Sequence, residues 1–285
     1  MLTPQNPAES PRKLKILLTE DNLVNRVLAQ KLLQKNGHTV TLANNGKEAT
    51  THWEKNHSNQ FDVLLMDIQM PVMDGLQATS YIRARERILQ TESSLPPDAK
   101  IHVPIIAMTA HAMKGDRERY MAGGMDGYVS KPINSTELEQ VLQSVVGGPS
   151  PRIFSPQQFT GTAEESNSAK SEDAEIRERF GRDANLMGEL AEIFALECPQ
   201  HLSGLQAAIR DKDAKALEHS AHTLKGCVAN FSSSGAFQSA LKLEMLGRSG
   251  DLADAPEILN ILEVQLLQLN EILSGMARNA VRAST

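Results

Sequence analysis

The chain has 285 residues, a length typical of two domains of ordinary size. Hydrophobic residues make up 40% and charged residues 22%, which fits a globular protein and argues against a disordered, fibrous or membrane-spanning chain. The formal net charge of -6 at pH 7 argues against proteins that hold nucleic acid or an anionic membrane through bulk positive charge.

The acidic excess lies in the second half of the chain. Residues 148–285 contain 13 Lys and Arg against 19 Asp and Glu, whereas residues 1–147 contain 16 of each. Cys198 and Cys227 are too few for a disulfide framework or a cysteine zinc site, which fits a reducing compartment. The longest apolar stretches are far shorter than the roughly 20 residues of a spanning helix, and the polar N-terminus lacks the apolar core of a signal peptide. We therefore expect a cytoplasmic chain that contacts neither membrane nor nucleic acid.

Short apolar runs alternate with helix-periodic segments over the first half. The predicted helices lie at 23–36, 46–56, 75–89, 112–122 and 135–146. The apolar runs, which we predict as strands, are KILLTED (15–21), HTVTLAN (38–44), DVLLMD (62–67), VPIIAMTA (103–110) and DGYVSKP (126–132). Several of these runs are continuously apolar, as in strands covered by helices on both faces. The pattern predicts an α/β domain with a doubly wound, five-stranded parallel sheet.

The second half contains a linker followed by helices. Residues 147–172 are rich in Gly, Pro, Ser and Glu without periodicity, which predicts a flexible linker. Apolar spacing then predicts one helix beginning near Leu186, and a separate helix carrying Leu202, Leu205 and Ile209. Two further stripes, which predict two more helices, are Leu217, Ala221, Leu224, Val228 and Phe231, and Leu259, Leu262, Leu266, Leu269 and Leu273. The whole pattern predicts a small antiparallel helical bundle.

Polar residues follow four of the predicted strands. They are Glu20 and Asp21, Asp67, Thr109 and Lys131. Because ligands bind at the carboxyl ends of strands in open α/β sheets, we expect these side chains to converge. Crowded carboxylates repel unless a cation neutralises them, and hard oxygen ligands favour Mg²⁺. A lysine charge and a threonine hydroxyl suit a phosphoryl group, although each residue alone is more often a helix cap, a turn residue or a solvated charge.

Residues 14–146 resemble the receiver domain of two-component response regulators, which has a flavodoxin-like fold. The motifs that carry the resemblance are TEDN (19–22), LLMDIQMPVMDG (64–75), PIIAMTA (104–110) and YVSKP (128–132). The resemblance implies that Asp67 is the phosphoacceptor. It also implies a Mg²⁺ site served by Glu20, Asp21, Asp67 and the main-chain carbonyl of Gln69.

The same resemblance assigns two residues to the phosphoryl group and one to a switch. Thr109 and Lys131 are expected to bind the phosphoryl group, with a cis peptide bond before Pro132. Tyr128 is expected to turn inward when Thr109 moves toward the phosphate. From its position alone, however, Tyr128 is typical of a half-buried strand aromatic.

One histidine lies opposite the apolar stripe of the third predicted helix. His222 projects away from the core, with Lys225 and Gly226 three and four residues further on. Glycine costs roughly 1 kcal/mol in a helix interior relative to Ala, which suggests a close approach by another protein. His219 and His222 could also be metal ligands, but no third ligand is evident nearby. We expect an exposed imidazole at His222 and a solvated side chain at His219.

The segment AHTLKG (221–226) is similar to the histidine phosphotransfer (HPt) domain, a four-helix bundle with an accessory helix. The resemblance implies that His222 becomes phosphohistidine with the help of Lys225 and Gly226. We predict domain limits of 14–146 for the receiver and 173–276 for the HPt domain, with terminal tails at 1–13 and 277–285.

These resemblances predict a phosphorelay protein that exchanges phosphate with a histidine kinase and other receivers, on Asp67 and His222. Whether these two sites exchange phosphate within one chain stays open. A second possibility is the C-terminal part of a hybrid sensor histidine kinase, since the chain lacks nucleotide-binding motifs of its own. A third is a dehalogenase-like phosphohydrolase using Asp67, but position 69, where such enzymes have a second Asp, is Gln.

Overall fold

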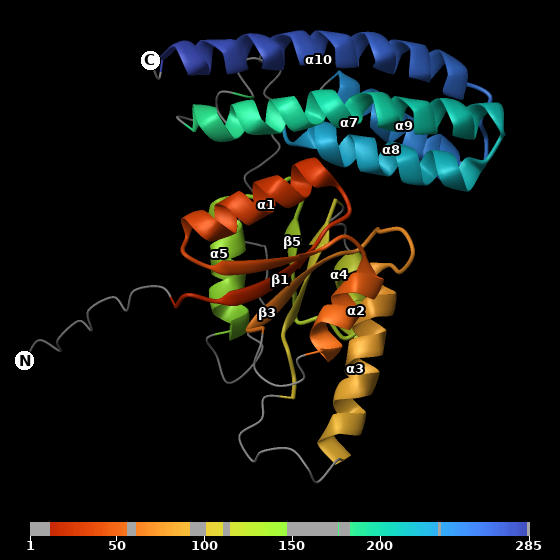
Figure 1. Cartoon of the computed structure of the whole chain (residues 1–285). Helices are drawn as coiled ribbons and strands as arrows, with labels where there is room; N and C mark the ends of the chain where they lie inside the picture. Colours follow the sequence, from red (N-terminus) through yellow and green to blue (C-terminus); the bar gives the residue numbers. More distant parts are fainter. Residues whose placement is uncertain are drawn as a thin grey trace, which may run out of the picture. The chain divides into compact units, whose positions relative to one another are not determined.

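The computed structural model describes residues 12–55, 61–91, 101–110, 115–146, 176, 183–232 and 235–283 (Figure 1). The chain divides into two compact units, which are described separately below. The predicted linker at 147–172 and nearly all of the predicted N-terminal tail lie outside the described residues.

The first unit contains the predicted five-stranded sheet. Its strands are β1 (Lys15–Thr19), β2 (Thr39–Ala43), β3 (Val63–Asp67), β4 (Ile105–Thr109) and β5 (Gly127–Ser130). They lie in the order β2-β1-β3-β4-β5. The pairs for which a register is defined, β1 with β2, β1 with β3 and β3 with β4, are all parallel. This arrangement confirms the predicted fold class of the first domain.

Helices connect successive strands, as a parallel sheet requires. The connecting helices are α1 (Leu23–Lys35), α2 (Gly46–Glu54), α3 (Gly75–Thr91) and α4 (Asp116–Ala122), and α5 (Ser135–Val146) follows β5. The start of the helix predicted at 112–122 falls partly outside the described residues, and α4 begins at Asp116.

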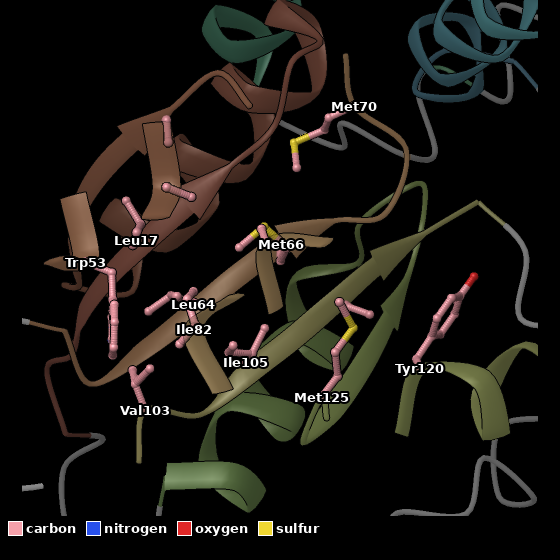
Figure 2. Packing of buried hydrophobic residues seen from close by; sticks show 14 of the residues in the cluster. Leu17, Trp53, Leu64, Met66, Met70, Ile82, Val103, Ile105, Tyr120 and Met125 are labelled. Atoms are coloured by element: carbon pink, nitrogen blue, oxygen red, sulfur yellow. The ribbon is translucent and has the colours of Figure 1, made fainter. Parts of the chain in front are cut away.

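Alternate residues of the strands face opposite sides of the sheet, and one side packs against α2, α3 and α4. Leu64, Met66 and Ile105 from the strands join Trp53 of α2 and Ile82 of α3 in one buried cluster (Figure 2). Strands β3 and β4 are buried along their entire length, which explains their continuously apolar sequences.

The second unit is a bundle built from four helices within the described part of the chain. They are α7 (Ala184–Arg210), α8 (Ala214–Ala229), α9 (Ala236–Ser249) and α10 (Ala255–Ala283). Asp183 and Asp213 cap the first turns of α7 and α8 by accepting backbone N–H bonds. The predicted bundle is confirmed. Helix α10 extends to Ala283, so it continues through most of the segment predicted as a C-terminal tail.

The prediction of two separate helices at the start of the bundle was wrong. Residues from Leu186 to Ile209 belong to one helix, α7, which continues through Pro199. Proline removes a backbone donor and costs about 3 kcal/mol in a helix interior. Apolar side chains on both sides of Pro199, among them Phe194 and Leu205, are fully buried, and their burial offsets this cost.

No helix among the residues that the structure describes is both long enough and apolar enough to cross a membrane.

A charged network holds the amino-terminal ends of β4 and β5 against α3. Arg83 donates to Glu86 at 2.8 Å and to Asp126 at 2.7 Å. His102 bridges the same two carboxylates, with ring nitrogens 3.3 Å from Glu86 and 2.9 Å from Asp126. Glu86 and Asp126 also accept the backbone N–H groups of Val103 and Ile105. Hydrogen bonds to Asp126 and Glu86 raise the pKa of His102 to about 9.

This raised pKa predicts a pH-dependent contribution of His102 to stability. Because the pKa of His102 is higher in the folded than in the unfolded protein, its charged ring stabilises the fold fully at a pH below the unfolded pKa near 6.5. This stabilisation is lost as the pH rises through the folded pKa of about 9. We expect His102→Gln to lower the thermal unfolding midpoint of the first unit clearly at pH 6 and hardly at pH 10. The exposed His219→Gln serves as the control, and a destabilisation that is equal at both pH values would contradict the assignment.

Candidate functional site

Three carboxyl groups meet at the carboxyl end of the sheet. Glu20 and Asp21 follow β1, and Asp67 is the last residue of β3. One oxygen from each lies within 4.8 Å of the others. The strand register explains the meeting, because Thr19 of β1 pairs with Met66 of β3, so that the next residues, Glu20 and Asp67, come side by side. Glu20 and Asp67 are buried and Asp21 is half-buried. The predicted convergence of these three residues is confirmed.

The loop after β3 folds back closely over Asp67. Gly75, the first residue of α3, donates its N–H to the carbonyl of Ile68 at 3.0 Å. A Cβ atom at position 75 would lie only 2.1 Å from the carbonyl oxygen of Asp67, so glycine is needed for this approach. The N–H of Gln69 donates to Asp67 Oδ1 at 3.4 Å. The role predicted for the carbonyl of Gln69 stays a prediction.

The other residues predicted around the phosphoryl group lie at the ends of neighbouring strands or within one. Thr109 is buried as the last residue of β4, directly after Met108, which pairs with Asp67. Lys131 follows β5, and its peptide bond to Pro132 is cis, as predicted. Tyr128 lies within β5, is half-buried and packs against the core cluster. An aromatic residue in a strand commonly packs in this way. The switch role of Tyr128 stays a prediction.

A second tyrosine contacts this region and was missed in the sequence. The hydroxyl of Tyr120, from α4, lies 3.0 Å from Thr109 Oγ1 in a buried hydrogen bond. Tyr120 is 5% exposed, and Figure 2 shows its ring at the edge of the buried cluster. The sequence of the short helix α4 gives no indication that Tyr120 contacts Thr109.

The histidine of the second unit is bonded to a carboxylate on the neighbouring helix. His222 on α8 places Nδ1 3.0 Å from Glu244 Oε1 on α9. The other oxygen, Oε2, accepts a short bond of 2.5 Å from Lys225 Nζ. Arg248 adds a third bond at 3.2 Å to Oε1. The expectation of an exposed imidazole was wrong, because the ring turns toward Glu244 and is buried.

Glu244 is the functional candidate that the sequence analysis missed. It is 1% exposed and lies on the buried face of α9, beside Ala240, Leu243 and Gly247. Burial alone would raise the pKa of Glu244, but the bonds from His222 and Lys225 outweigh it and lower the pKa to about 2. Glu244 is therefore ionised at pH 7. The sequence feature that could have identified Glu244 is its position on the apolar stripe of a helix, where a charged side chain is rarely buried without a partner.

Close packing of α8 and α9 brings these groups together. A Cβ atom at Gly247 would lie 2.4 Å from the backbone nitrogen of Glu218 and 2.7 Å from the carbonyl oxygen of Ala214. Glycine at position 247 thus lets the two helices approach, one turn away from Glu244. Gly226 lies on α8 one turn beyond His222, as predicted, and its supporting role stays a prediction.

The alternative of a histidine metal site gains no support. His219 is exposed, as expected. Across the described residues, the one group of three or more potential ligand side chains with suitably close atoms is Glu20, Asp21 and Asp67.

Comparison with known families assigns both units. Residues 16–143 match the response regulator receiver domain, and residues 189–278 match the Hpt domain. The chain is a receiver domain followed by an Hpt domain. This is an architecture of phosphorelay signalling, and it confirms both resemblances.

The relatives found are much longer than this chain. "Hybrid signal transduction histidine kinase I" of Dictyostelium discoideum is 45% identical over 134 residues, which cover 46% of this chain and 7% of that protein. "Probable histidine kinase 1" of Oryza sativa subsp. indica is 39% identical over 153 residues, covering 47% of this chain and 16% of that protein.

A solved receiver domain is also similar. The receiver domain of the sensor histidine kinase PA1611 from Pseudomonas aeruginosa, solved with a magnesium ion in its active site cleft, is 37% identical. The match covers 48% of this chain and all of that one, with a TM-score of 0.39.

The contacts of Glu244 predict a large effect on the stability of the Hpt domain. Replacing Glu244 with Ala leaves the buried ammonium group of Lys225 without this carboxylate, a change that typically costs about 3–5 kcal/mol. Equilibrium unfolding of the full chain by urea, followed by circular dichroism, measures the loss in the Hpt transition. The matched control is Glu218→Ala, whose partner Arg248 is half exposed and whose loss should cost at most about 1 kcal/mol. Equal effects of the two substitutions would contradict the central role of Glu244.

Proposed function

We propose that this chain is a phosphorelay component that carries phosphate on Asp67 of the receiver domain and on His222 of the Hpt domain. The observation that carries the proposal is chemical. One chain holds a buried carboxylate in an acidic cluster and a histidine whose Nδ1 is bonded to an ionised carboxylate. These are the two kinds of side chain between which a phosphorelay moves phosphate.

Mg²⁺ is the cation that suits the cluster. Glu20, Asp21 and Asp67 supply closely spaced carboxylate oxygens, the hard ligands that Mg²⁺ prefers, and we assign the carbonyl of Gln69 as a further ligand. When bound, the ion would neutralise negative charge on the carboxylates and on the phosphoryl oxygens.

Asp67 would act as the nucleophile of the receiver domain. One carboxylate oxygen attacks the phosphorus of a phosphohistidine, the P–N bond breaks, and the product is an acyl phosphate. The N–H of Gln69, bonded to Oδ1, helps to hold the carboxylate in place. Thr109 would donate a hydrogen bond to one phosphoryl oxygen, and Lys131 would place its positive charge beside another. Tyr128 would respond to the movement of Thr109.

His222 would act through Nε2. Because Glu244 is ionised and can only accept, Nδ1 of His222 must be the donor in their hydrogen bond. In the neutral ring this leaves the lone pair on Nε2 to attack the phosphorus of a receiver acyl phosphate, whose O–P bond breaks and releases the carboxylate. The ring gains positive charge as the N–P bond forms, and the negative charge of Glu244 stabilises it.

Lys225 and Gly226 would support the phosphorylated histidine. The ammonium group of Lys225 has three donors, so a bond to Glu244 leaves donors for a phosphoryl oxygen. The absence of a side chain at Gly226 would leave room for a partner domain to approach His222.

The partners proposed for the chain are other two-component proteins. A histidine kinase would supply phosphate to Asp67, and a further receiver domain would exchange phosphate with His222. Similarity to much longer histidine kinases supports a role beside a kinase core, whether that core lies in the same polypeptide or in a separate one.

The proposal predicts two separable labelling patterns. With a radiolabelled cognate kinase, Asp67→Ala should lose the base-labile acyl phosphate, and His222→Ala should lose the acid-labile, base-stable phosphohistidine. We expect each loss to exceed 100-fold, because the atom that bonds phosphorus is removed.

Matched substitutions test the specificity of the labelling. His219→Ala changes an exposed histidine one turn from His222, and Asp62→Ala changes an aspartate just before the opposite end of β3. Both should keep full labelling. Acyl phosphate surviving in Asp67→Ala, or phosphohistidine surviving in His222→Ala, would refute the corresponding assignment.

A further inference from the structure

We propose that Tyr120 is a positioning residue for phosphoryl transfer at Asp67, because its hydroxyl donates to Thr109 Oγ1 and thereby directs the single proton of Thr109 toward the phosphoryl group. This inference rests on the proposed function of Asp67 and Thr109. It adds a residue from α4 to the chemistry at the sheet edge, and none of the motifs in the sequence includes that residue.

The geometry starts from one buried hydrogen bond. Tyr120 and Thr109 are 5% and 3% exposed, and their oxygens are 3.0 Å apart. Thr109 ends β4 next to β3, whose last residue is Asp67. Burial is the largest effect on the pKa of Tyr120 and raises it, and the negative charges of Asp116 and, to a smaller extent, Asp67 act in the same direction. Tyr120 therefore keeps its proton at neutral pH and can serve as a donor.

The direction of the hydrogen bond follows from which groups can donate a proton and which can only accept one. Thr109 has one proton and two lone pairs. A phosphoryl group on Asp67 carries negative oxygens, which can only accept, so Thr109 must give its proton to the phosphoryl group. Tyr120 must then be the donor to Thr109 Oγ1. The resulting chain runs from Tyr120 to Thr109 to the phosphoryl oxygen, and each bond polarises and strengthens the next.

Burial favours the hydrogen bond between Tyr120 and Thr109 over other orientations of the two hydroxyl groups. A buried hydroxyl without a partner costs about 1–3 kcal/mol, so the bond to Thr109 opposes rotation of the Tyr120 side chain. The ring is also fixed by the cluster formed by α2, α3 and the sheet. Tyr120 can therefore hold the Thr109 hydroxyl in one orientation.

The test is binding of beryllofluoride, a phosphoryl mimic, to the full chain with saturating Mg²⁺, measured by calorimetry. Wild-type binding that is abolished by Asp67→Ala establishes the proposed site independently of Tyr120. Tyr120→Phe keeps the ring and removes only the hydroxyl. We expect it to weaken binding about threefold to tenfold, the range of one net hydrogen bond.

A double-mutant cycle separates positioning from simple packing. Thr109→Val should weaken binding by itself, and adding Tyr120→Phe should then have no further effect, because the positioned hydroxyl is already gone. The double variant also leaves neither hydroxyl unpaired, so it stays folded if the single variants are marginal. Circular dichroism checks the folding of each variant.

The control is Tyr81→Phe, which removes a tyrosine hydroxyl of α3 that is bonded to Glu54 of α2, and it should leave affinity unchanged. Unchanged or tighter binding by Tyr120→Phe overturns the proposal. So does a loss that adds in full to that of Thr109→Val.

Discussion

The parallel register of β1 and β3 is the constraint on which the receiver site depends. It places Glu20 beside Asp67, with Asp21 next to them, so that three carboxyl groups lie within 4.8 Å. Such crowding is unfavourable without a compensating positive charge. The fold is held elsewhere, by apolar strands and by the network around Arg83 at the opposite end of the sheet. The Arg83 network and the acidic cluster thus lie at opposite ends of the strands.

The Hpt domain places charge in the opposite way. Its central carboxylate, Glu244, is buried among positive or potentially positive groups, with bonds from His222, Lys225 and Arg248. The acid at the sheet edge has negative neighbours and suits a cation and a phosphoryl group. The acid in the bundle has positive neighbours and sets which nitrogen of His222 carries the proton. Under the proposed function, both arrangements would prepare a nucleophile, an oxygen in one domain and a nitrogen in the other.

Most of the fold and the acidic cluster could be predicted from the sequence, because both depend on local patterns. Continuous apolar runs defined β3 and β4, and strand ends located Asp67 and Thr109. What failed depended on contacts between distant segments. The two helices predicted from apolar spacing near Leu186 and Leu202 are one helix, because the packing of Phe194 and Leu205 keeps α7 continuous through Pro199. Glu244 and Tyr120 were missed because their partners lie on other elements, 22 and 11 residues away. The glutamate on the apolar stripe of α9 indicates a buried charge but not which residues pair with it, and α4 carries no comparable signal.

The most direct test of the central claim is phosphorylation of the purified chain by acetyl phosphate, with and without Mg²⁺, followed by peptide mass spectrometry on the intact acyl phosphate. If the crowded carboxylates need a cation before Asp67 can attack phosphorus, one phosphoryl group should appear on Asp67 with Mg²⁺ and be almost absent with EDTA. Phosphorylation of Asp67 at the same rate without the ion would contradict the account. A phosphoryl group on another carboxylate of the receiver domain would contradict it as well.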